Sequence, residues 1–336
     1  MKIKNDFSKI LNSYFTCHLQ LERKFSVNTY STYLIVIKQY ITYLNGIGIK
    51  SNNIFINDFN KSNVLSFLNY VENDLNCSAK TRNHKLAILS SFLEYAQSIN
   101  PIYLTVYLDV KSIKLKKIVK EKMDYMTINE LESFFKAIDL KHKSGYKHYV
   151  LFTILYETGV RVSELINIKI DDCYLTTDHP YIRILGKGNK ERIVYINDNV
   201  VKMILEYLNK FNIKDGFLLR NHSNGQYSRF GVNKTIDKYY EIAKKECPTL
   251  ERKRITPHTF RHSKAVHFLQ NGTALPIIQR FLGHSSIQTT EIYLDIANDV
   301  VIEAVKLAAN TLSSDNVESK WDNDENLITM LENLKL

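Results

Sequence analysis

The first hundred residues contain no proline, and their only glycines are Gly46 and Gly48. Proline removes a backbone donor and glycine costs conformational entropy, so a long stretch that lacks both favours helices. Apolar residues also recur there at helical spacing. The sequence therefore predicts a four-helix N-terminal domain within residues 1–110, with helices at about 5–19, 28–45, 61–73 and 79–98.

The remaining chain predicts a second, mainly helical domain over residues 125–310. Thr127 and Glu130 form a capping-box pattern, and Thr256 followed by Pro257 is a good helix start. Segments 181–185 and 191–196 read as strands joined by a glycine-containing turn, which predicts a small β-hairpin or sheet. Helices are expected at about 128–139, 147–158, 161–168, 199–211, 229–246, 257–270, 275–282, 286–294 and 298–309.

Charge is distributed unevenly along the 336 residues, whose net charge is +10. The densest positive block is KSIKLKKIVKEK at 111–122, so residues 111–124 are expected to form a basic interdomain linker. Residues 311–336 form an acidic C-terminal tail. A surplus of this size points toward a polyanion, either nucleic acid or an anionic membrane surface.

Several classes of protein are excluded early. No apolar run approaches the roughly 18 residues that a membrane-spanning helix needs, and the N-terminus lacks a signal-peptide core. The four cysteines, Cys17, Cys77, Cys173 and Cys247, are far apart without a CxxC pair. That pattern argues against a disulfide framework or a cysteine-rich zinc site and predicts a cytoplasmic protein with reduced thiols.

Four short segments carry residues suited to chemistry. Each has an ordinary explanation when it is taken alone: a structural ion pair, a surface cation, a helix end or a core tyrosine. The segments are TGVRVSEL with Arg161, the hairpin tip GKGNK with Lys187, HTFR with His258 and Arg261, and LGH with His284, followed nine residues later by Tyr293.

Together these residue types suit a phosphodiester. Two guanidinium groups can hold the non-bridging oxygens, a tyrosine can act as an oxygen nucleophile, and a lysine or histidine can protonate the leaving oxygen. His258 and His262 are spaced like zinc ligands, but Arg261 lies between them and the acidic base of an HExxH site is missing. A metal site is therefore not expected.

The order and spacing of these segments resemble the tyrosine recombinase (phage integrase) family. GKGNKER at 186–192 and LGHSSIQTTEIY at 282–293 look especially like its Xer and transposon-borne, mobile-element branches. The resemblance covers residues 125–310. Residues 5–100 resemble the family's SAM-like core-binding domain in outline. The implied fold is mainly α, with a four-helix core-binding domain and a tyrosine recombinase catalytic domain.

The resemblance implies a site-specific recombinase that needs no cofactor. Tyr293 attacks the scissile phosphate and leaves a 3′-phosphotyrosyl link, and two strand exchanges pass through a Holliday junction held by a tetramer on two double-stranded DNA sites. By the same resemblance, Arg161 and Arg261 clamp the phosphate and His284 hydrogen-bonds it. Lys187 protonates the leaving oxygen, and His258 assists proton transfer from Tyr293. Glu164 orients Arg161 or its helix.

Further DNA contacts are expected from basic residues in three places. They lie at the start of the fourth helix, in the basic linker and beside the hairpin tip. The residues are Lys80, Arg82, Lys85, Lys114, Lys116, Lys117, Lys190 and Arg192. The family suggests that the two domains clamp duplex DNA from opposite sides.

The acidic tail leaves alternatives open. Leu327, Ile328, Leu331 and Leu334 form an amphipathic stripe. In the family that the sequence resembles, a C-terminal helix often docks on the neighbouring protomer, so either the helix at about 298–309 or this stripe is expected to do so. Docking in cis and disorder are the alternatives. A second recombinase or an accessory protein is an open further partner. A type IB topoisomerase and a non-catalytic DNA-binding regulator are the rival functions.

The biological role is also open: chromosome dimer resolution, inversion or resolution, or transposition and phage-type integration and excision. The N-terminus is expected to be too short for an additional arm-binding domain, which favours systems with simple sites.

Overall fold

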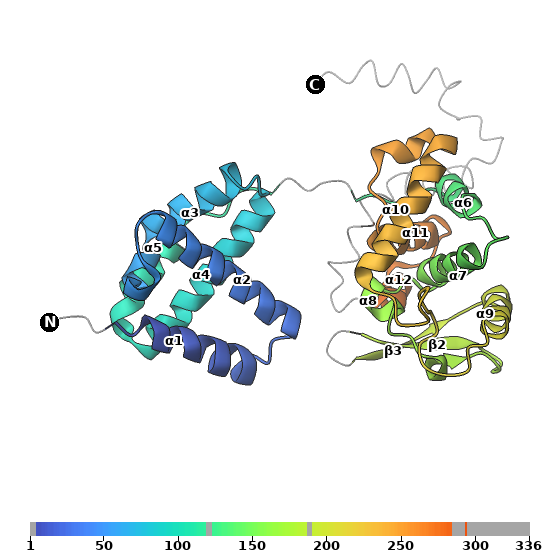
Figure 1. Ribbon diagram of the computed structural model, residues 1–336, viewed down its shortest axis with the longest axis horizontal. Coiled ribbons are helices and arrows are strands. Elements are labelled where there is room, and N and C mark those ends of the chain that lie inside the picture. Colours follow the sequence, from blue (N-terminus) through green and yellow to red (C-terminus); the bar gives the residue numbers. More distant parts are fainter. Residues whose placement is uncertain (1–4, 119–122, 187–189, 284–292, 294–336) are drawn as a thin grey trace, which may run out of the picture. The chain divides into compact units, whose positions relative to one another are not determined.

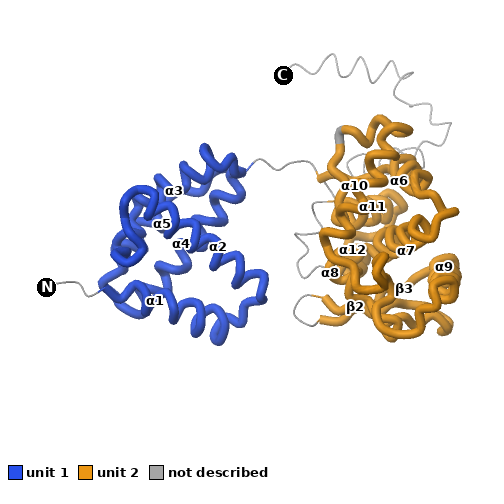
Figure 2. The backbone as a smooth tube through the Cα atoms, in the orientation of Figure 1, with its two compact units in different colours: residues 1–121 blue, residues 122–336 orange. Residues whose placement is uncertain are grey.

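The computed structural model describes residues 5–118, 123–186, 190–283 and 293 of the chain. The chain divides into two compact units, residues 1–121 and 122–336, which Figure 2 shows in different colours. Each unit has its own hydrophobic core, which is the mark of a domain.

The described part of the first unit is helical. Ser26, Asn60 and Ser78 each cap a helix by accepting a hydrogen bond from the backbone N–H three residues further on. The helices are α1 (Phe7–Ser13), which continues as a π-helix (Tyr14–Glu22), α2 (Val27–Gly46), α3 (Lys61–Asn73), α4 (Ala79–Ile99) and α5 (Leu104–Lys111).

The predicted helices of this unit correspond to the observed ones, and α5 is an addition. Pro101 begins a 3-10 turn, Pro101–Tyr103, and α5 has only 8 residues, too few for a clear helical period. Helix α4 packs against α2, α3 and α5, and its Phe92 lies among the rings of Phe7 and Phe59. The first unit is therefore built around α4 (Figure 1).

The basic linker does not begin where the charge pattern placed it. Ile113 is buried in the core of the first unit. The amide side chain of Asn83 donates to the carbonyl of Lys116 at 2.8 Å and accepts from its N–H at 3.0 Å. Residues 111–116 are thus anchored to the first unit, because an apolar side chain and a paired backbone hold them there.

The second unit combines helices with a three-stranded sheet, so the predicted fold class, mainly α with a small sheet, is confirmed (Figure 1). Helices at the predicted positions begin and end within a few residues of expectation. They are α6 (Ile128–Lys136), α7 (Lys143–Thr158), α8 (Val162–Leu165), α9 (Asp198–Lys210), α10 (Arg229–Glu246), α11 (Pro257–Gln270) and α12 (Leu275–Leu282).

The sheet is antiparallel, with its strands in the order β1 (Cys173–Tyr174), β2 (Tyr181–Leu185) and β3 (Glu191–Tyr195). Strands β2 and β3 form the predicted hairpin, which closes with the N–H of Gly186 on the carbonyl of Lys190 at 2.8 Å. Strand β1 was not predicted, because two residues show no alternation. Its partner β2 turns Ile182 and Ile184 into the core.

Helix α11 packs on α7, α10 and α12. Phe260 stacks on Phe152 of α7, with ring centroids 5.6 Å apart, and meets Phe134 of α6 edge to face. At the helix start, Thr256 accepts from the N–H of Thr259 as cap. This packing fixes the rotation of α11, so the other face of its first turns presents His258, Arg261 and His262 together.

Two predicted helices, 286–294 and 298–309, and the acidic tail lie outside the described residues, apart from Tyr293. None of the helices that are described is both long and apolar enough to cross a membrane.

Candidate active site

Arg261 joins three of the segments that the sequence singled out. Its guanidinium donates from Nη1 to the carbonyl of Gly159 and from Nη2 to the carbonyl of Leu282, each at 2.6 Å. The side chain is buried, and burial together with Arg161 lowers its pKa to about 10, so it stays charged at neutral pH. A buried cation thus connects the α7–α8 turn, α11 and the end of α12.

Arg261 bonds the carbonyl of Gly159 and the carbonyl of Leu282, the residue before Gly283. The backbone requires glycine at both Gly159 and Gly283. Gly159 ends α7 with φ +56°, and Gly283 ends α12 with φ +66°, both in the left-handed region. A Cβ at Gly159 would lie 2.9 Å from the ring of Phe281. Gly159 therefore lets the end of α7 approach α12 closely, and Gly283 lets the end of α12 approach Arg192.

Arg161 lies at the N-terminal cap of α8 and is hydrogen-bonded to Glu164, the residue expected to orient Arg161 or its helix. The backbone N–H of Arg161 donates to Oε2 of Glu164, and its Nη1 donates to Oε1, both at 2.9 Å. About a third of the Arg161 side chain is exposed, whereas Glu164 is buried. Arg161 can therefore present its remaining N–H groups to a ligand while Glu164 fixes its direction.

Glu164 also binds a second arginine, which the sequence analysis expected to contact DNA. Arg192 donates from Nη2 to Oε2 at 2.8 Å and from Nη1 to Oε1 at 3.2 Å. Burial alone raises the pKa of Glu164, but the hydrogen bonds from Arg192 and Arg161 outweigh burial and lower it to about 2. The structure differs from the expectation because this carboxylate, not solvent, faces Arg192.

Tyr293 is completely buried, and its hydroxyl lies 2.9 Å from Nδ1 of His262. Burial raises the pKa of Tyr293 to about 12, while Arg261 and Arg161 act in the opposite direction. Burial, with His258 and Arg261 nearby, lowers the pKa of His262 to about 4. A protonated phenol therefore faces a neutral imidazole beside two guanidinium groups.

The sequence reasoning missed this role of His262. In the sequence, His262 has a zinc-like spacing from His258, and the one signal for a place at this site is that it directly follows Arg261. His258 stacks on the same imidazole, with ring centroids 6.2 Å apart, and part of its ring is open to solvent. The surrounding protein, Arg261 and Arg161 lower the pKa of His258.

Lys187 and His284 fall outside the described residues, and their roles stay predictions. Both are bounded by described residues at the site: Gly186 begins the hairpin turn, and Gly283 lies against Arg192. Across the described ranges, no group of three or more His, Cys, Asp or Glu side chains could hold a metal ion.

The remaining predicted DNA contacts divide by exposure. Arg82 and Lys85 are buried in the first unit, so neither is presented as a surface phosphate contact. Arg82 lies near Glu72, and the Nζ of Lys85 donates to Gln39. The exposed cations are Lys80, Lys114, Lys116, Lys117 and Lys190, and among them Lys116 pairs with Glu72 at 2.7 Å.

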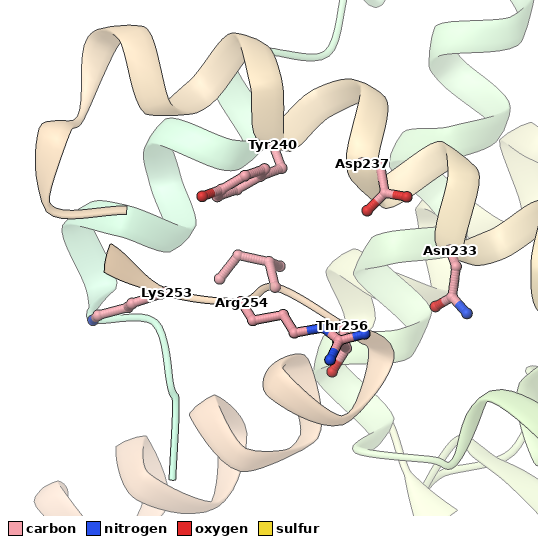
Figure 3. Close-up of a pocket in the computed structure, with 7 residues that line it drawn as sticks. Asn233, Asp237, Tyr240, Lys253, Arg254 and Thr256 are labelled. Carbon is pink, nitrogen blue, oxygen red and sulfur yellow. The ribbon is translucent and has the colours of Figure 1, made fainter. Parts of the chain in front are cut away.

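Helix α10 and the segment that leads into α11 enclose a pocket of about 330 Å³ (Figure 3). Asn233, Asp237 and Tyr240 line it from α10, and Arg254 and Thr256 face them. Lys253, at its edge, pairs with the buried Glu130 at 2.6 Å. The pocket thus adjoins the start of the helix that carries Arg261.

Two arginines beside a buried tyrosine suit phosphodiester chemistry, and comparisons with known proteins identify the family. The model of the phage integrase family matches residues 124–299, and that of the N-terminal SAM-like domain of phage integrases matches residues 13–99. The first match alone spans more than half of the chain. The chain therefore belongs to the phage integrase family of tyrosine recombinases and is a site-specific recombinase enzyme.

Individual relatives agree. The putative integrase/recombinase y4rC of Sinorhizobium fredii is 28% identical over 327 residues, which cover 97% of both chains. Tyrosine recombinase XerD of Staphylococcus haemolyticus is 30% identical over 292 residues, covering 83% of this chain and 91% of the relative. The Xer-like character predicted from the hairpin and LGH segments is confirmed.

Solved structures share the fold. XerH site-specific recombinase, bound to palindromic difH substrate in a post-cleavage complex, has a TM-score of 0.67 at 23% identity, covering 92% of this chain and 90% of that one. The Tn1549 transposon integrase, in complex with a circular intermediate DNA, has a TM-score of 0.64 at 16% identity, covering 84% and 93%.

Proposed function

We propose that this recombinase cuts each DNA strand by attack of Tyr293 on the scissile phosphate. A bond forms between the phenolic oxygen and phosphorus, and the bond to the 5′ oxygen breaks. The products are a 3′-phosphotyrosyl link and a free 5′-hydroxyl. The observation that carries the proposal is the position of the Tyr293 hydroxyl, 2.9 Å from His262 on the helix that carries Arg261.

The two arginines supply the positive charge that the reaction needs. Charge grows on the non-bridging oxygens of the phosphate in the transition state, and fixed cations stabilise it most in a site from which water is excluded. Arg261 is held rigidly by two carbonyl groups, and Arg161 is held by Glu164 with part of its guanidinium exposed. We assign both arginines to the phosphate clamp.

The proton of Tyr293 needs an acceptor, because the pKa of the buried phenol is about 12. His262 is neutral at pH 7, and in the tautomer protonated on Nε2 its Nδ1 accepts from the tyrosine hydroxyl. His258, predicted from the family for this step, stacks on His262. We propose that these two histidines together receive the proton, with His262 in direct contact.

The steps that involve Lys187 and His284 rest on the family resemblance. Lys187 donates a proton to the leaving 5′ oxygen, and His284 hydrogen-bonds the phosphate. The exposed cations Lys80, Lys114, Lys117 and Lys190 contact the backbone of double-stranded DNA. The Tn1549 integrase structure, in complex with a circular intermediate DNA, and the XerH structure, bound to a palindromic difH substrate, support DNA sites as the substrate.

Rejoining reverses the attack with the 5′-hydroxyl of a partner strand. Bond energy is retained in the phosphotyrosine, so no external energy source is required. Two successive exchanges pass through a Holliday junction, and four protomers on two sites supply the four tyrosines. In this assembly we propose that the acidic tail, residues 311–336, docks on a neighbouring protomer. Deleting residues 312–336 should then weaken synapsis more than single-site binding.

A nicked suicide substrate tests the nucleophile. Wild type should accumulate a covalent protein–DNA complex, and Tyr293→Phe should form none. Tyr156→Phe is the matched control, because Tyr156 also hydrogen-bonds a histidine of α11, His267 at 2.8 Å. Trapping by Tyr293→Phe would refute the assignment. Relaxation of a plasmid without paired sites would indicate a type IB topoisomerase, and binding with no cleavage by wild type would indicate a regulator.

A further inference from the structure

The side chain of Arg192 is directed into the protein rather than toward a surface ligand. Only 14% of its side chain is exposed, compared with 35% for Arg161. Its aliphatic part lies against the end of α12, where a Cβ on Gly283 would be 2.8 Å from Cδ of Arg192. Its Nε is buried and has no hydrogen-bond partner among the described residues. This arginine is therefore poorly placed to neutralise a DNA phosphate.

Arg192 and Arg161 share the same carboxylate. Each oxygen of Glu164 accepts one hydrogen bond from Arg192 and one from Arg161: Oε1 from a guanidinium of each, Oε2 from the Arg192 guanidinium and the Arg161 backbone. Glu164 is only 4% exposed, so these donors replace its contact with water. A bidentate arginine–carboxylate pair has a fixed plane, and this plane sets the direction in which Glu164 meets Arg161.

Removing Arg192 would leave the carboxylate in a different electrostatic state. Three guanidinium groups act on Glu164: Arg161 at the start of α8, Arg192 on β3, and, at longer range, Arg261 on α11. Burial favours the protonated acid, and Arg192 is the strongest of the influences that oppose it. Without Arg192, Glu164 is more readily protonated, and a protonated Glu164 holds Arg161 less firmly.

We propose that Arg192 is a positioning residue for the recombination reaction, which holds Glu164 so that Glu164 can orient Arg161 toward the scissile phosphate. The proposal rests on the role assigned to Arg161 under the proposed function. Arg192 thereby connects strand β3, immediately after the hairpin turn, to the two arginines of the phosphate clamp. This positioning role takes the place of the DNA contact that the sequence predicted for Arg192.

The test compares Arg192→Met with wild type and with Lys190→Met, which removes an exposed cation assigned to the DNA backbone and so shows what the loss of a phosphate contact does. Duplex affinity is measured by titration at several salt concentrations, and cleavage by single-turnover trapping on the suicide substrate from pH 5.5 to pH 8. For Arg192→Met we expect cleavage to fall at least tenfold while affinity changes less than threefold. The salt dependence of binding should be unchanged, whereas a lost phosphate contact reduces its slope by about one.

The pH profile separates positioning from a merely structural role. Cleavage by Arg192→Met should decline further on the acid side, relative to wild type, as Glu164 takes up a proton. That additional decline should disappear in Arg192→Met/Glu164→Gln, which has no carboxyl group to titrate. The double variant should also lose little more than either single variant, because the two residues act as one unit.

Three results would overturn the proposal. They are cleavage by Arg192→Met equal to that by wild type, a loss of affinity in proportion to the loss of cleavage, or an additional acid-side decline that persists in Arg192→Met/Glu164→Gln. Arg192→Lys, which keeps the charge but not the fork, provides a second variant if Arg192→Met unfolds, and it should be intermediate in rate. Failure of the proposed function is distinguishable, because it would show as covalent trapping by Tyr293→Phe.

Discussion

Gly283→Ala should destabilise the protein by two separable effects. The backbone of Gly283 has φ +66°, and a non-glycine residue in this left-handed region costs about 1–2 kcal/mol. The new Cβ would also lie 2.8 Å from Cδ, 3.1 Å from Nε and 3.3 Å from Cζ of Arg192. Because Glu164 holds that side chain at two points, it cannot move away freely, and overpacking adds about 1–3 kcal/mol.

Gly272→Ala is the matched control. Gly272 follows α11 with φ +78°, and a Cβ there would meet nothing within 4 Å, so only the backbone cost remains. At about 2–4 °C per kcal/mol for a unit of this size, Gly272→Ala should lower Tm by about 2–8 °C. Gly283→Ala should lower Tm by about 2–12 °C more, from the additional overpacking of about 1–3 kcal/mol.

A double-mutant cycle assigns the additional cost to Arg192. In an Arg192→Ala background the space beside Gly283 is empty, so Gly283→Ala should cost no more than Gly272→Ala does in wild type. Differential scanning calorimetry of the full chain measures all of these variants. An equal cost of Gly283→Ala with and without Arg192 would show that the close approach is not an energetic contact, and the reasoning would be refuted.

Three further predictions concern buried charge and histidine. Lys253→Met should lower the free energy of unfolding by about 3 kcal/mol, because it leaves the buried Glu130 without its ion pair. Calorimetry should show that Lys253→Met/Glu130→Gln restores part of this loss. Burial lowers the pKa of His148 to about 4. Below about pH 6.5 the folded state therefore binds fewer protons than the unfolded state, in which the pKa of histidine is about 6.5. The free energy of unfolding consequently falls as the pH drops toward 4. His148→Gln should reduce that acid-side loss of Tm, and an unchanged pH dependence would contradict it. In DNA titrations, Lys80→Gln should reduce the salt slope of binding by about one, whereas Arg82→Gln, which removes a buried cation, should lower stability and leave the slope unchanged.

The catalytic helix shows how much local sequence carries. Thr256 as cap, Pro257 as first helical residue and the apolar period after them depend only on neighbours along the chain, and α11 begins and ends where they predicted. Gly159 likewise marks the end of α7. Since such signals are local, the order of elements and of the arginine and histidine segments follows from the amino-acid sequence alone.

The partners of those residues do not follow in the same way. Arg261 meets the carbonyl of Gly159, 102 residues earlier, and Arg192 meets Glu164, 28 residues earlier. A basic residue looks the same in sequence whether it faces solvent or a buried carboxylate, which is why Arg82, Lys85 and Arg192 were all expected to contact DNA.

The sequence by itself determined the family, the helical architecture and the residues available for phosphodiester chemistry, because each depends on residue type and short spacing. Only the tertiary structure decided that His262 faces Tyr293 and that Arg192 binds the Glu164 carboxylate that also holds Arg161. The physical reason is that burial and hydrogen-bond partners are set by packing between elements distant in the chain, and these in turn set the protonation and direction of each group.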